Sequence, residues 1–325
     1  MSTVSPRSDS IAGALLGTAV GDALGMPVEG LSHANVRTYY KGIKEYRDDD
    51  QRGDLDAGQW TDNTQMTFAL VRALTDHPAS PDAWPAAVAD EYVALRPEAR
   101  RWGETTTTAV DRLADGTAPV ESGVPDRPTD GAAMRAAPLG VWWAARDLDR
   151  AAAFEAIRPV LAVTHRHPAA LAAGWGQAVA VHTLLGWTPD AFDRAAFWER
   201  LVDATAWAEG RLGGDDRVSG RLEALADQLD AFPLNLGDAC DGVGVRADEA
   251  WPFACAMVAR RAHLLENTLL SGINVGGDAD TTGAMMGAML GALHGWSAFP
   301  DEWGEGLEAF DRLEAEARAL AGVLS

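Results

Sequence analysis

Two short segments carry oxygen-bearing side chains of the kind that bind divalent cations. They are Thr61, Asp62 and Asn63 in the first segment and Asp278, Asp280 and Thr281 in the second. Each segment stands directly before a stretch with helical spacing, so both groups are expected at helix N-termini. Hard cations prefer carboxylate, hydroxyl and amide oxygens, and neither segment supplies His or Cys. The pattern predicts a Mg²⁺ site, with Mn²⁺ or Ca²⁺ as alternatives.

Helix capping is the simpler interpretation of either segment taken alone. Asp62 with Gln65 resembles a capping box, and Asp280 could cap the later helix in the same way. An EF-hand is excluded, because its last ligand position falls on Met289, where a bidentate Glu is needed. The residues by themselves leave the choice between two caps and one shared cation site open.

Glycine stripes mark the helices that must position these segments. Glycines recur at every fourth residue from Gly13 to Gly25 and again from Gly283 to Gly295. A glycine inside a helix costs up to about 1 kcal/mol relative to alanine, and close helix packing is the usual compensation. We therefore expect both helices at the centre of the molecule, where they could pack against each other.

The rest of the chain also shows helical spacing. Apolar residues recur at intervals of three and four in residues 11–24, 66–74, 83–95, 107–113, 132–145, 168–185, 192–207, 218–229, 251–265, 282–293 and 307–320. Neither alternating strands nor hairpin signals are evident, so the fold class is all-α. No repeat or change in composition marks a domain boundary. We expect a flexible segment over residues 1–10 and a single domain over residues 11–325.

Composition narrows the possible partners and the compartment. The chain has 27 Lys and Arg against 48 Asp and Glu, a net charge of −21, which disfavours general nucleic-acid binding. An anionic ligand would need bound cations to reverse the local field. Cys240 and Cys255 form no CxxC pair, which indicates a reducing, cytoplasmic setting. The longest apolar stretch is taken as residues 282–296, shorter than the ~20 residues that span a bilayer, so no membrane partner is expected.

The chain resembles the ADP-ribosylglycohydrolase family, which includes the dinitrogenase-reductase-activating glycohydrolases, over about residues 11–300. The resemblance lies in short motifs spread in order along the sequence. They are residues 13–17, 21–25, 60–62, 64–67, 102–106, 131–135, 138–140, 164–165 and 276–281, together with Glu29. It implies a single compact all-α domain with orthogonally packed helices and a two-magnesium cluster at the base of a cleft.

The resemblance also implies a role for particular residues. Thr61, Asp62, Asn63, Asp278, Asp280 and Thr281 match the metal-binding positions. Asp62 or Asp280 would take a proton from the attacking water, and Glu29 would act as an acid toward the leaving group. The ligand-binding positions are Gly103 and Thr105 beside the distal ribose, Gly131, Ala132, Met134 and Arg135 along the diphosphate, and His165.

Two positions depart from the family pattern. Asn63 stands where a second adjacent aspartate is usual, so the second Mg²⁺ site is expected to be weak, with Mn²⁺ as an alternative ion. Asp130 stands where many members carry Asn. The expected function is hydrolysis of the bond between ADP-ribose and a modified acceptor, first of all an arginine on a protein. The acidic loop of residues 45–58 would attract that guanidinium group.

Two other functions stay open beside hydrolysis. The first is an ADP-ribose-binding regulatory protein whose activity is weak or absent because of Asn63. The second is a structural role, as in lens crystallins related to this family. The pair Asp278 and Asp280 argues against a structural role, because such a role needs no paired carboxylates.

Overall fold

The computed structural model describes residues 8–324, and within that range every regular element is a helix. In chain order the α-helices are α1 (Ser8–Gly25), α2 (His33–Asn35), α3 (Asp62–Asp76), α4 (Trp84–Leu95), α5 (Glu104–Ala114), α6 (Pro119–Ser122), α7 (Ala137–Ala144), α8 (Arg150–Leu161), α9 (Pro168–Leu185), α10 (Arg194–Leu212), α11 (Arg217–Leu225), α12 (Pro233–Ala239), α13 (Ala247–Arg261), α14 (Leu265–Ile273), α15 (Ala279–His294), α16 (Asp301–Glu305) and α17 (Phe310–Leu324). One hydrophobic core extends from Ile11 to Leu324. The all-α, single-domain prediction is confirmed.

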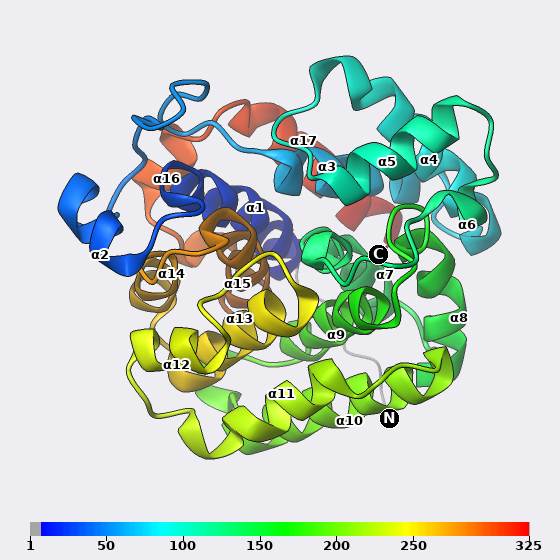
Figure 1. The fold of residues 1–325 in the computed structure, drawn as a ribbon. Coiled ribbons are helices and arrows are strands. Elements are labelled where there is room, and N and C mark those ends of the chain that lie inside the picture. Colours follow the sequence, from blue (N-terminus) through cyan, green and yellow to red (C-terminus); the bar gives the residue numbers. More distant parts are fainter. Residues whose placement is uncertain (1–7, 325) are drawn as a thin grey trace.

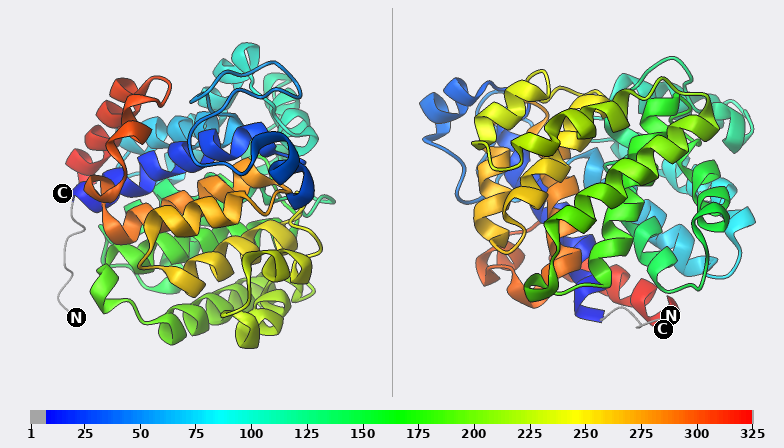
Figure 2. Two further views of the ribbon diagram at one scale, coloured as in Figure 1. Left: turned by 90° about the vertical axis from the view of Figure 1, so that its left-hand side faces the viewer. Right: turned by 90° about the horizontal axis from the view of Figure 1, so that it is seen from below.

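Helices α1 and α15 run side by side through the centre of the molecule (Figures 1 and 2). A Cβ atom added to Gly13 would lie 2.4 Å from the carbonyl oxygen of Gly291, and one added to Gly21 would lie 1.9 Å from that of Gly283. The residue numbers rise along one helix as they fall along the other, so the pair is antiparallel. The predicted packing of the two glycine stripes is confirmed. It brings the first turn of α15 beside the last turn of α1.

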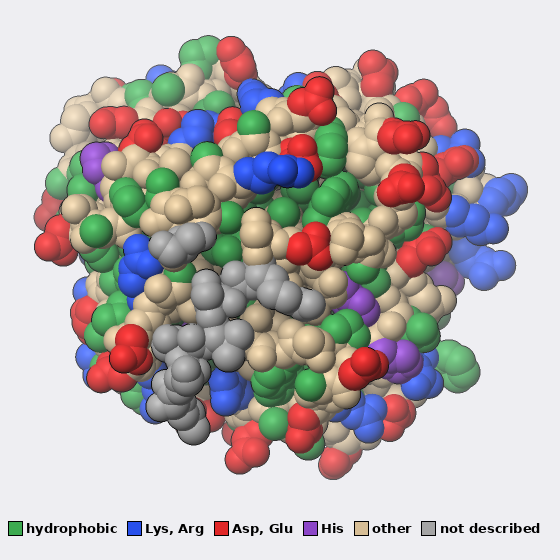
Figure 3. Space-filling model, turned by 180° about the vertical axis from the view of Figure 1, so that it is seen from behind, with side chains coloured by type: hydrophobic (Ala, Val, Ile, Leu, Met, Phe, Trp, Pro, Cys, Tyr) green, Lys and Arg blue, Asp and Glu red, His purple; other side chains and the backbone are tan. Residues whose placement is uncertain are grey.

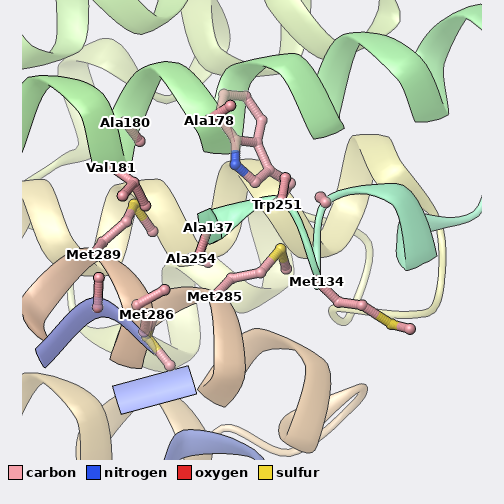
Figure 4. Close-up of a cluster of buried hydrophobic side chains, with 14 of the residues drawn as sticks. Met134, Ala137, Ala178, Ala180, Val181, Trp251, Ala254, Met285, Met286 and Met289 are labelled. Atoms are coloured by element: carbon pink, nitrogen blue, oxygen red, sulfur yellow. The ribbon is translucent and has the colours of Figure 1, made fainter. Parts of the chain in front are cut away.

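The other side of α15 packs against α9 and α13. Figure 4 shows methionine side chains of α15, among them Met285 and Met289, next to small residues of α9 and beside Trp251 of α13. Gln177 of α9 accepts a hydrogen bond from Trp251 Nε1 at 3.0 Å and donates one to the carbonyl of Met285 at 3.1 Å. These contacts fix α15 between its neighbours and therefore fix the residues at its N-terminus.

The start of the chain differs from the sequence-based expectation. Residues 1–7 of the expected flexible segment lie outside the described residues, whereas residues 8–10 already belong to α1. Asp9 accepts hydrogen bonds from the backbone N–H and the hydroxyl of Ser297. These bonds attach the first turn of the helix to the far end of the chain.

The apolar stretch of α1 is longer than the one singled out in α15. Ser8–Val28 is, within the described residues, a stretch long and apolar enough to cross a bilayer by length and composition. Taking residues 282–296 as the longest was therefore wrong. Because 94% of its most apolar window is buried inside the protein, the composition is that of a core helix. Charged side chains of both signs are scattered over the face seen in Figure 3, among hydrophobic and other side chains.

Some helices were not predicted, or differ in their bounds from the prediction. Helix α8 was not predicted, since it is rich in Arg and Ala and contains Pro159. Its start is set by Asp149, whose side chain accepts from the backbone of Ala152 at 2.8 Å. The predicted helix over residues 132–145 divides into a 3₁₀ turn, η5 (Asp130–Ala132), and α7. Proline is best tolerated in the first turn of a helix, and Pro138 stands there in α7.

Candidate active site

Asp22 of α1 organises the N-terminus of α3, which carries the first oxygen segment. Its carboxylate accepts hydrogen bonds from the backbone N–H groups of Thr61, at 3.0 Å, and Thr64, at 2.9 Å. It also accepts from their hydroxyls, at 2.8 Å and 2.6 Å. Burial raises the pKa of Asp22 to about 6, and the hydrogen bonds from Thr64 and Thr61 act in the opposite direction. The sequence analysis gave Asp22 no role, although a carboxylate in a glycine-rich apolar helix was a signal.

Since Asp22 supplies these acceptors, the side chains of residues 61–63 need not cap α3. Thr61 is the N-cap residue of α3 and Asp278 that of α15, and neither side chain makes a capping hydrogen bond. Gln65 instead bonds the backbone of Glu98 and Arg100. Asp62 and Asp280, for which capping was considered, lie inside α3 and α15 and are not the N-cap residues, and Gln65 forms no capping box.

The two segments with oxygen-bearing side chains, residues 61–63 and 278–281, are in contact. Thr61 Oγ1 lies 3.2 Å from Asp280 Oδ2, and Asn63 Nδ2 donates to the same Asp280 oxygen at 3.3 Å and to Thr61 Oγ1 at 2.9 Å. Asp62 is the next residue along α3, and its carboxylate lies 3.4 Å from Thr61 Oγ1. The close approach of α1 and α15 therefore joins side chains more than 200 positions apart in the sequence.

Like charges crowd together at this meeting point. Burial, followed by the charge of Asp280, raises the pKa of Asp62 well above its usual value. Burial and the charge of Glu29 do the same for Asp280, and burial and the charge of Asp130 do so for Asp278. Buried carboxylates without a cationic partner are costly, because they lose hydration and repel one another. A divalent cation would relieve both costs.

The donor atoms suit a hard cation. Three buried acceptors, Asn63 Oδ1, Asp130 Oδ2 and Asp280 Oδ1, have no hydrogen-bond partner among the described residues. A buried acceptor left unpaired costs about 1–3 kcal/mol. Within residues 8–324, no group of three or more Asp, Glu, His or Cys side chains is placed to hold a metal by itself. The fit therefore depends on a mixed set in which hydroxyl and amide oxygens complete the carboxylates.

A cavity of about 340 Å³ opens above this cluster. The predicted residues that line it are Glu29, Asp62, Gly103, Thr105, Gly131, Met134, His165, Asp278, Asp280 and Thr281. Thr61, Asn63, Ala132 and Arg135 are fully buried and do not line it. A larger hollow of about 990 Å³, beside α16 and α17, contains none of the predicted site residues.

Arg135 is placed beneath the predicted diphosphate loop rather than on its surface. Its guanidinium donates to the carbonyl of Gly131 at 2.6 Å and to that of Leu161 at 3.2 Å. It also lies over the ring of Tyr92. In this arrangement Arg135 supports the turn from behind and does not face the cavity.

His165 connects two walls of the cavity. Its Nδ1 lies 2.7 Å from the hydroxyl of Thr164, and its Nε2 lies 3.0 Å from that of Thr129. The Thr129 hydroxyl donates in turn to Thr105 at 3.1 Å. Burial lowers the pKa of His165 well below its usual value, so the imidazole is neutral. The ring also packs under Gly131, where an added Cβ would lie 2.7 Å from Cε1.

The acidic loop is held over the cavity rim by two arginines. Glu29 is paired with Arg52 and, at 3.2 Å, with Arg101. Arg101 also pairs with Asp54 and, at 2.6 Å, with Asp49. Several carboxylates of the loop are therefore already engaged within the protein. These ion pairs were not foreseen from the sequence, because nothing in it indicates that Arg101 reaches across to Asp49.

A second unforeseen contributor is the loop of residues 240–246. The carbonyl of Val243 accepts from the backbone N–H of Asp278 at 2.7 Å, and that of Val245 accepts from Asp130 at 3.1 Å. Asp241 and Val243 have positive φ angles of 55° and 60°, which are unusual for residues other than glycine. This loop therefore fixes the backbone at Asp278 and at Asp130, and no motif in its sequence predicted that role.

Comparisons with known proteins show which family the chain belongs to. Residues 3–325 match the family model for ADP-ribosylglycohydrolase. The chain is 29% identical over 330 residues to the ADP-ribosyl-(dinitrogen reductase) glycohydrolase of Rhodospirillum rubrum, covering 97% of both chains. It is 26% identical over 344 residues to the ADP-ribosylhydrolase ARH3 of Mus musculus, covering 96% of this chain and 90% of that one.

A solved structure shows the same fold. It is described as an ADP-ribosylglycohydrolase-related protein complex and superimposes with a TM-score of 0.74 at 24% identity, covering 99% of this chain and all of that chain. The family match spans nearly the whole sequence, and the curated relatives cover it from end to end. The chain belongs to the ADP-ribosylglycohydrolase family of hydrolases.

Proposed function

We propose that this protein is a Mg²⁺-dependent hydrolase that removes ADP-ribose from a modified acceptor by cleaving the glycosidic bond at the anomeric carbon of the ribose. The observation that carries the proposal is the cluster at the base of the cavity. There Asp62, Asp278 and Asp280 are buried together, and acceptor atoms of Asn63 and Asp280 have no partner. Such a site binds a cation and excludes most water, which suits chemistry at a polar bond.

The cation would be held by Thr61, Asp62, Asn63, Asp278, Asp280 and Thr281. Bound there, Mg²⁺ would polarise a water molecule and the ribose hydroxyls. The chain itself supplies the acceptor for the proton of that water, and Asp62 and Asp280 both line the cavity. Burial raises the pKa of each in the metal-free protein, and a bound cation would act in the opposite direction, so either carboxylate would be ionised and able to accept the proton.

Glu29 also lines the cavity, where it would face the leaving group. Its Oε2 atom is engaged by Arg52 and Arg101. A role as proton donor therefore requires that these contacts open when the substrate binds. In the arrangement described here, Glu29 holds the acidic loop to the rim of the site.

The acceptor that we propose first is an arginine on a protein. The loop of residues 45–58 remains acidic at the cavity rim, although Asp49 and Asp54 are paired with Arg101. The relative from Rhodospirillum rubrum is named for ADP-ribosyl-(dinitrogen reductase), which supports a protein-linked substrate. In the present protein, the free cysteines Cys240 and Cys255 favour a cytoplasmic location. The net charge of this chain disfavours nucleic acid as a general partner.

A second function is favoured by one observation at Asn63. Its amide nitrogen, and not its oxygen, faces Asp280, so this position donates a hydrogen bond where a cation would need an acceptor. Amide orientation follows the hydrogen-bond network and can reverse. If it does not reverse, the cation site is incomplete, and the protein would bind ADP-ribose as a regulatory module with weak or no hydrolysis.

The test is calorimetric titration of ADP-ribose into the metal-free protein and into the Mg²⁺-loaded protein, followed by release from an ADP-ribosylated arginine peptide. Metal-dependent binding with release supports the hydrolase. Binding without release from arginine, serine or other conjugates supports the regulatory module. The D280A variant should lose both metal binding and turnover, and normal activity of that variant would refute the assigned site.

A further inference from the structure

Asp130 is a buried carboxylate at the cavity that has no assigned role. It is 5% exposed, is the first residue of η5 and lines the cavity. Its backbone is fixed by hydrogen bonds from its N–H to Val245, at 3.1 Å, and from Ala133 to its carbonyl, at 2.7 Å. These bonds fix the backbone of Asp130 at the cavity wall.

Among the described residues, no ion pair joins a basic side chain to this carboxylate. The arginines of the cavity wall and the adjoining loop are engaged elsewhere: Arg101 with Asp49, Arg127 with Glu104, and Arg246 with Asp248. The carboxyl group of Asp130 contacts that of Asp278, and its Oδ2 has no hydrogen-bond partner among the described residues. Two buried carboxyl groups in contact, one with a free oxygen inside a cavity, form the donor pair that a hard cation requires.

Asn63 belongs to the same cluster and brings no charge. Its amide nitrogen donates to Asp280, so Asp62 is the one carboxylate that residues 61–63 supply. Asp130, in η5, supplies one further carboxylate. The charge of the site is thus displaced from α3 toward η5.

We propose that Asp130 is a further cation ligand, which acts together with Asp278 and takes over the charge that Asn63 does not supply. The inference rests on the proposed function, because it places one of the divalent cations that the hydrolase would use. The site would take Mg²⁺ or Mn²⁺, held between η5 and the N-terminus of α15. Asp130 then faces a cation rather than the diphosphate, which it would otherwise repel.

The experiment measures cation binding without any substrate. The metal-free protein is titrated with MgCl₂ by calorimetry and with MnCl₂ by electron paramagnetic resonance, for the unmodified chain and for D130N. We expect D130N to bind one cation at least about tenfold more weakly, the size of effect typical when a metal site loses a supporting carboxylate. D126N is the control, because Asp126 is exposed, lies on the same loop and changes the net charge equally.

The outcomes separate this inference from the proposed function. D130N that binds both cations as tightly as the unmodified chain overturns the inference, and so does an equal loss in D126N, because the effect would then be one of long-range charge. The N63D/D130N double variant should recover the lost affinity; if it is folded and still as weak as D130N, the exchange of roles is refuted. An unmodified chain that binds no Mg²⁺ or Mn²⁺ would instead refute the cation requirement of the proposed function. Thermal unfolding of each variant confirms that it is folded.

Discussion

Gly131 leaves room for the ring of His165 in the cavity wall because it has no side chain. An added Cβ would lie 2.7 Å from Cε1 and 2.8 Å from Nε2 of His165, so the ring would have to move. Moving it breaks the contact between His165 and Thr129, which connects the two walls. One buried hydrogen bond lost in this way costs about 1–3 kcal/mol. We therefore expect G131A to bind ADP-ribose about tenfold or more weakly in a calorimetric titration.

The control for this variant is G210A. Gly210 is exposed in α10, does not line the cavity, and an added Cβ there would meet nothing within 4 Å. We expect its affinity for ADP-ribose to stay close to that of the unmodified chain. Equal affinity in G131A and the unmodified protein would show that His165 can move without cost to binding.

His182 provides a prediction on pH that is independent of the cation site. Its ring stacks on Trp143 with centroids 4.0 Å apart, and burial lowers its pKa to about 4. The folded state therefore keeps His182 neutral, whereas the unfolded chain takes up a proton below about pH 6.5. Stability from this group is complete above that pH and is lost as the pH falls toward 4, by about 3 kcal/mol.

The measurement is urea unfolding of the unmodified chain and of H182F at pH 7 and pH 4. Phenylalanine keeps a flat ring against Trp143 but cannot take up a proton. The difference in unfolding free energy between the two proteins should shift by about 3 kcal/mol in favour of H182F on acidification. A difference that is the same at both pH values would contradict the assignment. The comparison cancels the carboxylates, which titrate in both proteins.

Residue types showed which chemistry the site could do, but not every partner. Thr61, Asp62 and Asp280 were identified because oxygen donors before helices form a short local pattern. Asp22 was missed because its partners, Thr61 and Thr64, lie about 40 residues away and meet it only after folding. Asp130 was noted for its charge, but its contact with Asp278 depends on the loop of residues 240–246. Contacts of that kind leave no periodic signal in a sequence.

At the scale of elements, the glycine stripes were the most informative pattern. Their spacing predicted two central helices, because close helix packing offsets the free-energy cost of so many glycines in a helix. Helices α1 and α15 pack together in this way. The predicted bounds of α9 agree with the structure, since His167 and Pro168 set its start. Helix α14 was not predicted, and the predicted stretch of residues 251–265 ran across the bend at residues 262–264, which contains neither glycine nor proline. The orientation of α3 depends on Asp22, and no helical periodicity encodes it.

The contact between the stripes predicts the effect of a single methyl group. In G21A the new Cβ would meet the carbonyl oxygen of Gly283 at 1.9 Å, and both atoms belong to helix backbone that cannot rotate aside. Overpacking a core with one group costs about 1–3 kcal/mol even where side chains can adjust. We expect G21A to lose more than about 3 kcal/mol in urea unfolding, or to fail to fold.

The control is G220A in α11. Gly220 is exposed within that helix, and an added Cβ would meet nothing within 4 Å. Alanine is the better helix former, so this variant should gain up to about 1 kcal/mol. The opposite signs of the two changes separate helix propensity from helix contact. A G21A protein as stable as the unmodified chain would mean that α1 and α15 can separate freely.

At the scale of the whole molecule, the net negative charge and the buried carboxylates both destabilise the folded state when no cation is bound. The net charge of −21 produces self-repulsion in the compact state, and the cluster concentrates part of that charge where water cannot screen it. A divalent cation bound to the folded state, but not to the unfolded chain, therefore stabilises the entire fold. The same sites that would serve hydrolysis would also make the stability of the protein depend on Mg²⁺.

That dependence is measurable without any substrate. Mg²⁺ at a hundred times its dissociation constant should raise the unfolding free energy by about 2.7 kcal/mol and raise the melting temperature accordingly. KCl at equal ionic strength reproduces the screening of surface charge but not the coordination, and it should give a smaller shift. D278N removes one buried carboxylate of the cluster. This variant should melt at a higher temperature than the unmodified chain when both are metal-free, because like-charge repulsion is reduced, yet respond less to Mg²⁺. If Mg²⁺ and KCl shift the unmodified chain equally, the carboxylates of α15 do not hold a cation.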